Sequence, residues 1–122
     1  MNPTAKDLLA GIDVGANVLA DGESFTSTAS ELYAFEGDAK PSLLLQISGA
    51  GTVTVESITR HETDGDFYSE DRPNEIVSDF AANANPQAIR VSLPVCLAAK
   101  FKFTATGAVT ILKAVMNTYY GK

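Results

Sequence analysis

Residues 42–60 read Ser-Leu-Leu-Leu-Gln-Ile-Ser-Gly-Ala-Gly-Thr-Val-Thr-Val-Glu-Ser-Ile-Thr-Arg. Apolar and polar residues alternate on both sides of the central Gly-Ala-Gly, which is typical of strands that bury one face. The glycines predict a tight turn between these strands. The stretch therefore predicts two antiparallel strands with apolar side chains inward and polar side chains outward. Ile58 has the wrong parity, and we expect a β-bulge near Glu56 and Ser57 to restore it.

The same alternation appears in the second half of the chain, over residues 89–93 and 100–106. Further strands are expected at residues 24–28, 31–35, 75–80 and 109–120. About eight strands separated by turn signals predict an all-β fold, an antiparallel β-sandwich that is jelly-roll-like. The predicted core consists of inward residues of these strands: Leu43, Leu45, Ile47, Val53, Val55, Ile89, Val91, Leu93, Phe101 and Phe103.

The first 23 residues show no such alternation and contain three glycines. Thr4 and Asp7 have the spacing of a helix N-cap and the third residue of its helix. We therefore expect an irregular N-terminal arm or a short helical turn at 1–23, and a β-sandwich domain at 24–122. The length of 122 residues is close to the usual size of one domain.

The last expected strand has a weaker pattern, because its apolar residues do not share one parity. A strand covered on both faces would explain this, and so would a strand whose outer face meets a partner. The candidate interface residues are Leu112, Val115, Met116, Tyr119 and Tyr120. The segment before Ser24 is a second candidate for the same contact.

Charge is distributed unevenly along the chain, which has a net charge of −6. All 15 acidic residues lie in 1–79. The charged residues of 80–122 are all basic: Arg90, Lys100, Lys102, Lys113 and Lys122. Two interpretations stay open, chance placement on solvated surfaces and complementary patches between subunits. The acidic balance argues against a nucleic-acid partner. No apolar run is long enough to predict a membrane span.

No combination of residues predicts a catalytic site. His61 and Cys96 are the only histidine and the only cysteine. Cys96 lies in an apolar setting that suits an inert thiol, and a catalytic pair with His61 would also need an orienting carboxylate. One cysteine allows no intrachain disulfide, which is consistent with folding in a reducing cytoplasm. We therefore expect a protein that is not an enzyme and needs no cofactor.

The acidic stretch at 62–71 is the best candidate for a small site. Oxygen ligands for Ca²⁺ would come from Asp64, Asp66, Glu70 and Asp71. The order of acids and glycine does not match a dedicated calcium loop, and Asp-Gly is first a hairpin signal. We expect a solvated turn without a metal, with calcium as the alternative.

Two pairs of neighbouring aromatic residues suggest a different function. They are Phe67 with Tyr68 and Tyr119 with Tyr120. Sugar-binding sandwiches use exposed rings as platforms, so a carbohydrate- or receptor-binding module is the alternative function. The simpler interpretation is that each pair places one ring in the core and one at its rim.

The segment Gly51-Thr-Val-Thr-Val-Glu-Ser, followed by Asp64-Gly65 and Phe67, resembles the small β-sandwich proteins of tailed-phage virions. The segment at 86–94, Pro-Gln-Ala-Ile-Arg-Val-Ser-Leu-Pro, resembles their next strand, and 101–110 resembles their final hairpin. The acidic loop after Phe67 departs from the pattern. The resemblance covers about residues 43–120 and implies capsid decoration or cementing, or a tail or fibre component.

The resemblance, taken with the lack of a predicted catalytic site, implies a non-enzymatic bacteriophage structural protein, first of all a capsid decoration or cement protein. It would act by surface complementarity between subunits, as a homo-oligomer in contact with the major capsid protein or another virion protein. The expected location is the virion, after synthesis in the host cytoplasm.

Overall fold

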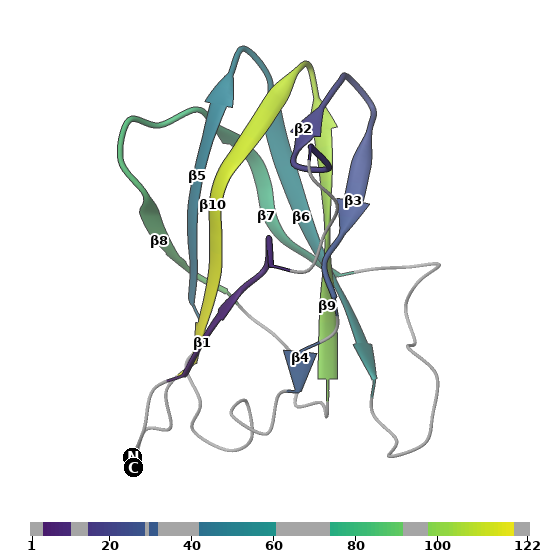
Figure 1. The fold of residues 1–122 in the computed structure, drawn as a ribbon, viewed down its shortest axis with the longest axis vertical. Coiled ribbons are helices and arrows are strands. Elements are labelled where there is room, and N and C mark those ends of the chain that lie inside the picture. The colour runs from purple at the N-terminus through teal and green to yellow at the C-terminus, as the bar shows by residue number, and fades with distance from the viewer. Residues whose placement is uncertain are drawn as a thin grey trace.

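The structure is a computed structural model that describes residues 4–10, 15–28, 30–31, 42–60, 74–91 and 98–118. These residues form two antiparallel sheets that face each other (Figure 1). The strands are β1 (Thr4–Asp7), β2 (Val18–Leu19), β3 (Ser24–Thr26), β4 (Ser30–Glu31), β5 (Ser42–Gly49), β6 (Thr52–Arg60), β7 (Asn74–Ala81), β8 (Gln87–Arg90), β9 (Ala98–Thr106) and β10 (Val109–Thr118).

The strand order is that of a jelly roll. The first sheet has the order β1-β10-β5-β8, and β2 also pairs with β10. The second sheet has the order β3-β9-β6-β7, and β4 also pairs with β9. The short strands β1 and β2 can be counted together as the first strand, and β3 and β4 as the second, which leaves eight strands in chain order. Their order is then 1-8-3-6 in one sheet and 2-7-4-5 in the other. This double-sheet arrangement of eight strands confirms the predicted all-β, jelly-roll-like sandwich.

The core lies between the sheets and consists of the side chains that the alternation predicted to point inward. Eight of the ten predicted core residues are buried, and Ile89 is partly buried against them. Leu93 lies outside the described residues. The N-terminal segment adds Leu8 and Leu19, which are 0% and 4% exposed.

The predicted bulge near Glu56 is wrong. The pairing of β6 with β9 runs without a break from Thr52 to Arg60, so the parity does not change. Ser57 and Thr59 lie opposite Phe101 and Ala99 and are buried on the core face. Ile58 remains on the outer face, where it is 5% exposed and does not belong to the core cluster. The irregular pairing of β6 is with β7 on its other side, and the extra residues of these bulges belong to β7.

The weak pattern of the last strand has a local cause, a β-bulge in β10. Ile111 pairs with Ile47 and Lys113 pairs with Gln46, which leaves Leu112 as the extra residue. The bulge moves the inward positions from Val109 and Ile111 to Ala114 and Met116. One residue inserted into an antiparallel strand changes the parity beyond it, so the strand needs no second cover to explain its sequence.

The expectation of a separate arm at 1–23 needs correction for the described part of that segment. Residues 4–7 form β1, which pairs with the end of β10, and residues 18–19 form β2, which pairs with its beginning. A turn follows β1, in which the Ala10 amide donates to the Asp7 carbonyl oxygen at 3.2 Å. Leu8 donates its amide to the Ala114 carbonyl oxygen at 2.8 Å. These residues are thus part of the sandwich.

Two asparagines extend the first sheet beyond its short edge strands. The backbone carbonyl oxygen of Asn17 accepts a hydrogen bond from the Ile111 amide. The Asn17 side-chain Nδ2 donates to the Ile111 carbonyl oxygen at 3.0 Å. On the other edge, Asn83 pairs with β5 beyond the end of β8: its Oδ1 accepts from the Ile47 amide and its Nδ2 donates to the Leu45 carbonyl oxygen. Both satisfy backbone groups that a longer strand would otherwise pair.

Candidate interaction surface

The outer face of the first sheet is formed by side chains that alternate with the core residues. We call it the β10 face; its described members are Asp7, Val18, Ser42, Leu44, Gln46, Ser48, Ala88, Arg90, Thr110, Leu112, Lys113, Val115 and Asn117. The register places Ala88, Leu44 and Val115 side by side on three neighbouring strands. Asp7, at the edge, is the only acid among these members. The row of Ala88, Leu44 and Val115 is therefore apolar, and Lys113 is the charged residue near the centre of the face.

The outer face of the second sheet has a different composition. On β6 and β9 it presents threonines and charged residues: Thr52, Thr54, Glu56, Lys100, Lys102 and Thr104. Glu56 lies directly opposite Lys102, an arrangement of opposite charges that stabilises neighbouring strands. Ile58 also lies on this face but is 5% exposed. The other residues named here are polar or charged, in contrast to the apolar row of the β10 face.

Two large apolar side chains are prominently exposed on the β10 face. Val18 is 58% exposed and Leu112 is 50% exposed. Val18 pairs with Thr110, and Leu112 follows two residues later at the bulge. Since the bulge displaces Leu112 from the regular inward and outward alternation, an apolar side chain reaches solvent in the middle of a sheet.

The interface residues predicted from the sequence have different positions. Leu112 and Val115 lie on the β10 face, exposed and half-buried respectively. Met116 is in the core with 2% exposed, because the bulge turns it inward, so it offers no surface to a partner. Tyr119 and Tyr120 lie outside the described residues.

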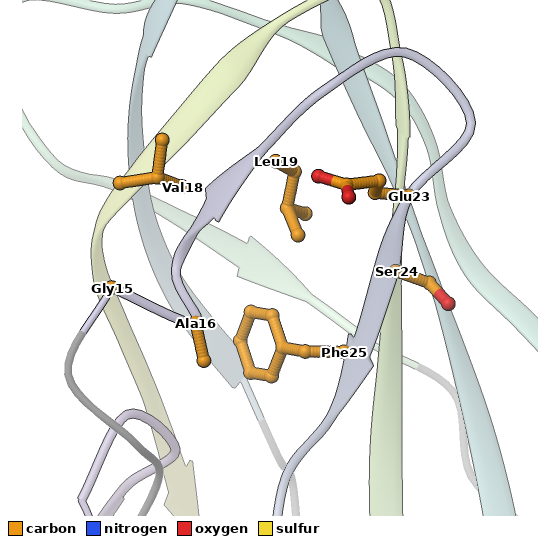
Figure 2. Close-up of a pocket in the computed structure, with 7 residues that line it drawn as sticks. All are labelled: Gly15, Ala16, Val18, Leu19, Glu23, Ser24 and Phe25. Atoms are coloured by element: carbon orange, nitrogen blue, oxygen red, sulfur yellow. The ribbon is translucent and has the colours of Figure 1, made fainter.

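An open hollow of about 350 Å³ lies beside the β10 face, between the edge strands of the two sheets. It is lined by Gly15, Ala16, Val18, Leu19, Glu23, Ser24 and Phe25. The Phe25 ring stacks on Phe103, with ring centroids 4.8 Å apart and an angle of 12° between planes. Figure 2 shows the Glu23 carboxylate pointing toward Leu19, with the Phe25 ring further down the hollow.

The sequence did not predict this hollow. Its residues come from two short strands and the turn between them, and only their pairing with β10 and β9 brings them to the edges of the two sheets. The turn is held in place by the Gly22 amide, which donates to the Ala105 carbonyl oxygen, and by Asp21, whose Oδ1 accepts from the Gly107 amide at 2.8 Å. The spacing of residues along the sequence does not predict hydrogen bonds between segments so far apart.

The other residues singled out from the sequence lie outside the described part of the chain. They are His61, Asp64, Asp66, Phe67, Tyr68, Glu70, Asp71 and Cys96. Among the residues that are described, no three His, Cys, Asp or Glu side chains gather as they would around a metal ion. The same residues contain no helix with the length and apolar character required to cross a membrane.

No family model and no curated protein matches this sequence. The fold is similar to the crystal structure of the infectious bursal disease virus VP2 subviral particle, with a TM-score of 0.55 and 9% identity over 98% of this chain and 31% of that chain. The structure of the infectious bursal disease virus Gx strain aligns with a TM-score of 0.46 and 10% identity, over 98% of this chain and 32% of that chain. The chain thus spans about a third of the length of the solved structures it matches. The first of these similarities supports the sandwich fold.

Proposed function

We propose that this chain is a non-enzymatic structural protein of a virus particle, and specifically a capsid decoration or cement protein. It acts by surface complementarity, with itself as a homo-oligomer and with the major capsid protein or another virion protein. The observation that carries the proposal is the β10 face, which has an apolar row of Ala88, Leu44 and Val115 and, nearer the start of β10, the exposed side chains of Val18 and Leu112. Its fold is also similar to that of a protein whose structure is described as a subviral particle.

The chemical difference between the two outer faces supports assembly. Leucine and valine on a sheet face that remains in water keep part of their apolar surface in contact with solvent, whereas burial of apolar surface contributes about 25 cal/mol for each Å² removed from water. Central apolar residues with a polar margin are also the usual anatomy of a protein interface. Ser42, Ser48 and Asn117 provide such a margin around Leu44 and Val115.

The experiment is a comparison of molar mass by size-exclusion chromatography with light scattering. The variant Leu112→Glu places a charge on the β10 face, and Thr106→Glu places the same charge at an exposed position on the outer face of the second sheet. We expect the wild-type chain and Thr106→Glu to self-associate and Leu112→Glu to shift to the monomer. Equal behaviour of the two variants would contradict the role of the β10 face.

The carbohydrate- or receptor-binding alternative depends on aromatic pairs that lie outside the described residues, so the structure adds no support to it. This alternative predicts a monomer that binds a glycan, and a measurement of size combined with a glycan-binding screen tests it. A monomer at high concentration that binds a glycan would replace the assembly proposal.

A further inference from the structure

The hollow between β2 and β3 combines an apolar wall with a single carboxylate. Leu19 is 4% exposed, and Phe25 is half-buried with its ring stacked on Phe103. Among the described residues that line the hollow, Glu23 is the one ionisable residue. An apolar surface beside one negative charge suits a chain of methylene groups that ends in a cation, because such side chains bury their stems and leave the charged end at the rim.

The carboxylate of Glu23 is already oriented for such a contact. Its Oε1 accepts a hydrogen bond from the Ala20 amide at 2.7 Å, which holds the side chain across the turn. Its Oε2 accepts no hydrogen bond from the described residues. The fixed carboxylate thus keeps acceptor capacity that faces the hollow (Figure 2), and a hydrogen bond between two charged groups is stronger than one between neutral groups.

The chain itself carries a matching cation on β10, the strand that pairs with one wall of this hollow. Lys113 is exposed, and it follows Leu112 at the bulge in β10. The hollow begins at Val18, which pairs with Thr110 on the same strand. Arg90 is also exposed on the β10 face, but it lies on β8 at the opposite edge of the sheet. Among the described residues, Lys113 is therefore the exposed cation on the strand that pairs with the β2 wall of the hollow.

We propose that the hollow is the binding site for Lys113 of a second copy of this chain, and that Glu23 pairs with its ammonium group. A projecting cation and its receiving hollow lie on one contiguous patch, and a patch that complements itself generates a closed two-fold pair. Each pair then contains two Lys113–Glu23 contacts, with Val18 and Leu112 of both copies between them. This inference rests on the proposed function and names the contact that self-assembly uses.

Charge reversal with purified full-length chains tests the pair. Glu23→Lys and Lys113→Glu each convert both contacts into repulsions, and each should raise the dissociation constant for self-association at least about tenfold. An equal mixture of the two variants should restore wild-type affinity, since both contacts between unlike chains join opposite charges. The double variant Glu23→Lys/Lys113→Glu should also recover. Sedimentation velocity over a range of concentrations measures the dissociation constant of the two single variants, their mixture and the double variant.

Two controls separate the contact from effects on folding and on overall charge. Glu23→Gln keeps an oxygen acceptor for the Ala20 amide and removes the charge, so it should weaken association while thermal unfolding at concentrations too low for association is unchanged. Thr106→Glu adds the same carboxylate as Lys113→Glu does, but on the outer face of the second sheet, and should leave affinity within about twofold. If Glu23→Lys does not fold, Glu23→Gln and Lys113→Glu provide the same answer.

The outcomes distinguish this inference from the proposed function. If the wild-type chain self-associates but the charge reversals have no effect, or their mixture does not recover, the Lys113 site is wrong and assembly through the β10 face stands. If the wild-type chain remains a monomer at every concentration, both proposals are wrong.

Discussion

Phe103 is held on both sides by neighbouring strands. It is fully buried, lies opposite Val55 on β6 and Phe25 on β3, and stacks on the Phe25 ring. We expect Phe103→Ala to lower the free energy of unfolding by about 3–5 kcal/mol, because burial is lost and a cavity remains. Phe25→Ala should cost clearly less, since its ring is only half-buried. Urea unfolding of both variants tests this order, and an equal loss would contradict it.

Asp79 has a backbone conformation that L residues rarely adopt. Its φ is 48°, and it lies in β7 where the pairing with β6 is irregular. Asp79→Gly and Asp79→Ala both remove the carboxylate, so the difference between them isolates the backbone. We expect the glycine variant to be more stable by about 1 kcal/mol, because a Cβ disfavours the left-handed region. Thermal unfolding that ranks the alanine variant equal or higher would contradict this conformation.

At the scale of elements, two turns contact each other through glycine backbone. The β5–β6 turn and the β9–β10 turn lie at one end of the sandwich (Figure 1), and the Gly51 amide donates to the Ala108 carbonyl oxygen at 3.1 Å. A Cβ on Gly51 would meet the Thr106 carbonyl oxygen and lie 2.5 Å from the Gly107 carbonyl carbon. The Gly49-Ala50-Gly51 sequence thus serves the packing of turns.

This contact predicts an unequal effect of two glycine substitutions. Gly51→Ala should destabilise by about 1–3 kcal/mol, because the added methyl group forces backbone apart. Gly22 has a φ of +83° and open space around its Cα, so Gly22→Ala should cost about 1 kcal/mol through backbone strain alone. Chemical denaturation compares them, and a smaller effect at Gly51 would show that the turns do not touch.

How much of each element could be predicted depended on whether its residues alternate. The strands at 42–49, 52–60 and 98–106 alternate clearly, and their inward residues are the core. A change of parity, as in β10, has several possible causes in a sequence, because a bulge and a second cover produce the same pattern. β1 and β2 are too short to show a period, and only their pairing with β10 makes them strands.

For the whole molecule, the sequence predicted the sandwich and the part of β10 that reaches its surface, but not the hollow. Leu112 and Val115 stood out because they disturbed the alternation, and they lie on the β10 face. Glu23 and Phe25 gave no signal, since their chemistry depends on edges of two sheets that come together only in the fold. Composition along the chain also gave no sign that one outer face carries a central apolar row and the other carries mainly threonines and charged residues.

The measurement that tests the account most directly is sedimentation equilibrium of the wild-type chain at low and high salt. We predict self-association in both conditions, weaker at high salt because exposed charges are screened over about 8 Å at physiological ionic strength and over less at higher salt. The apolar contribution of the β10 face does not depend on that screening, so association should persist. A chain that remains monomeric at high concentration in both conditions would contradict assembly through the β10 face.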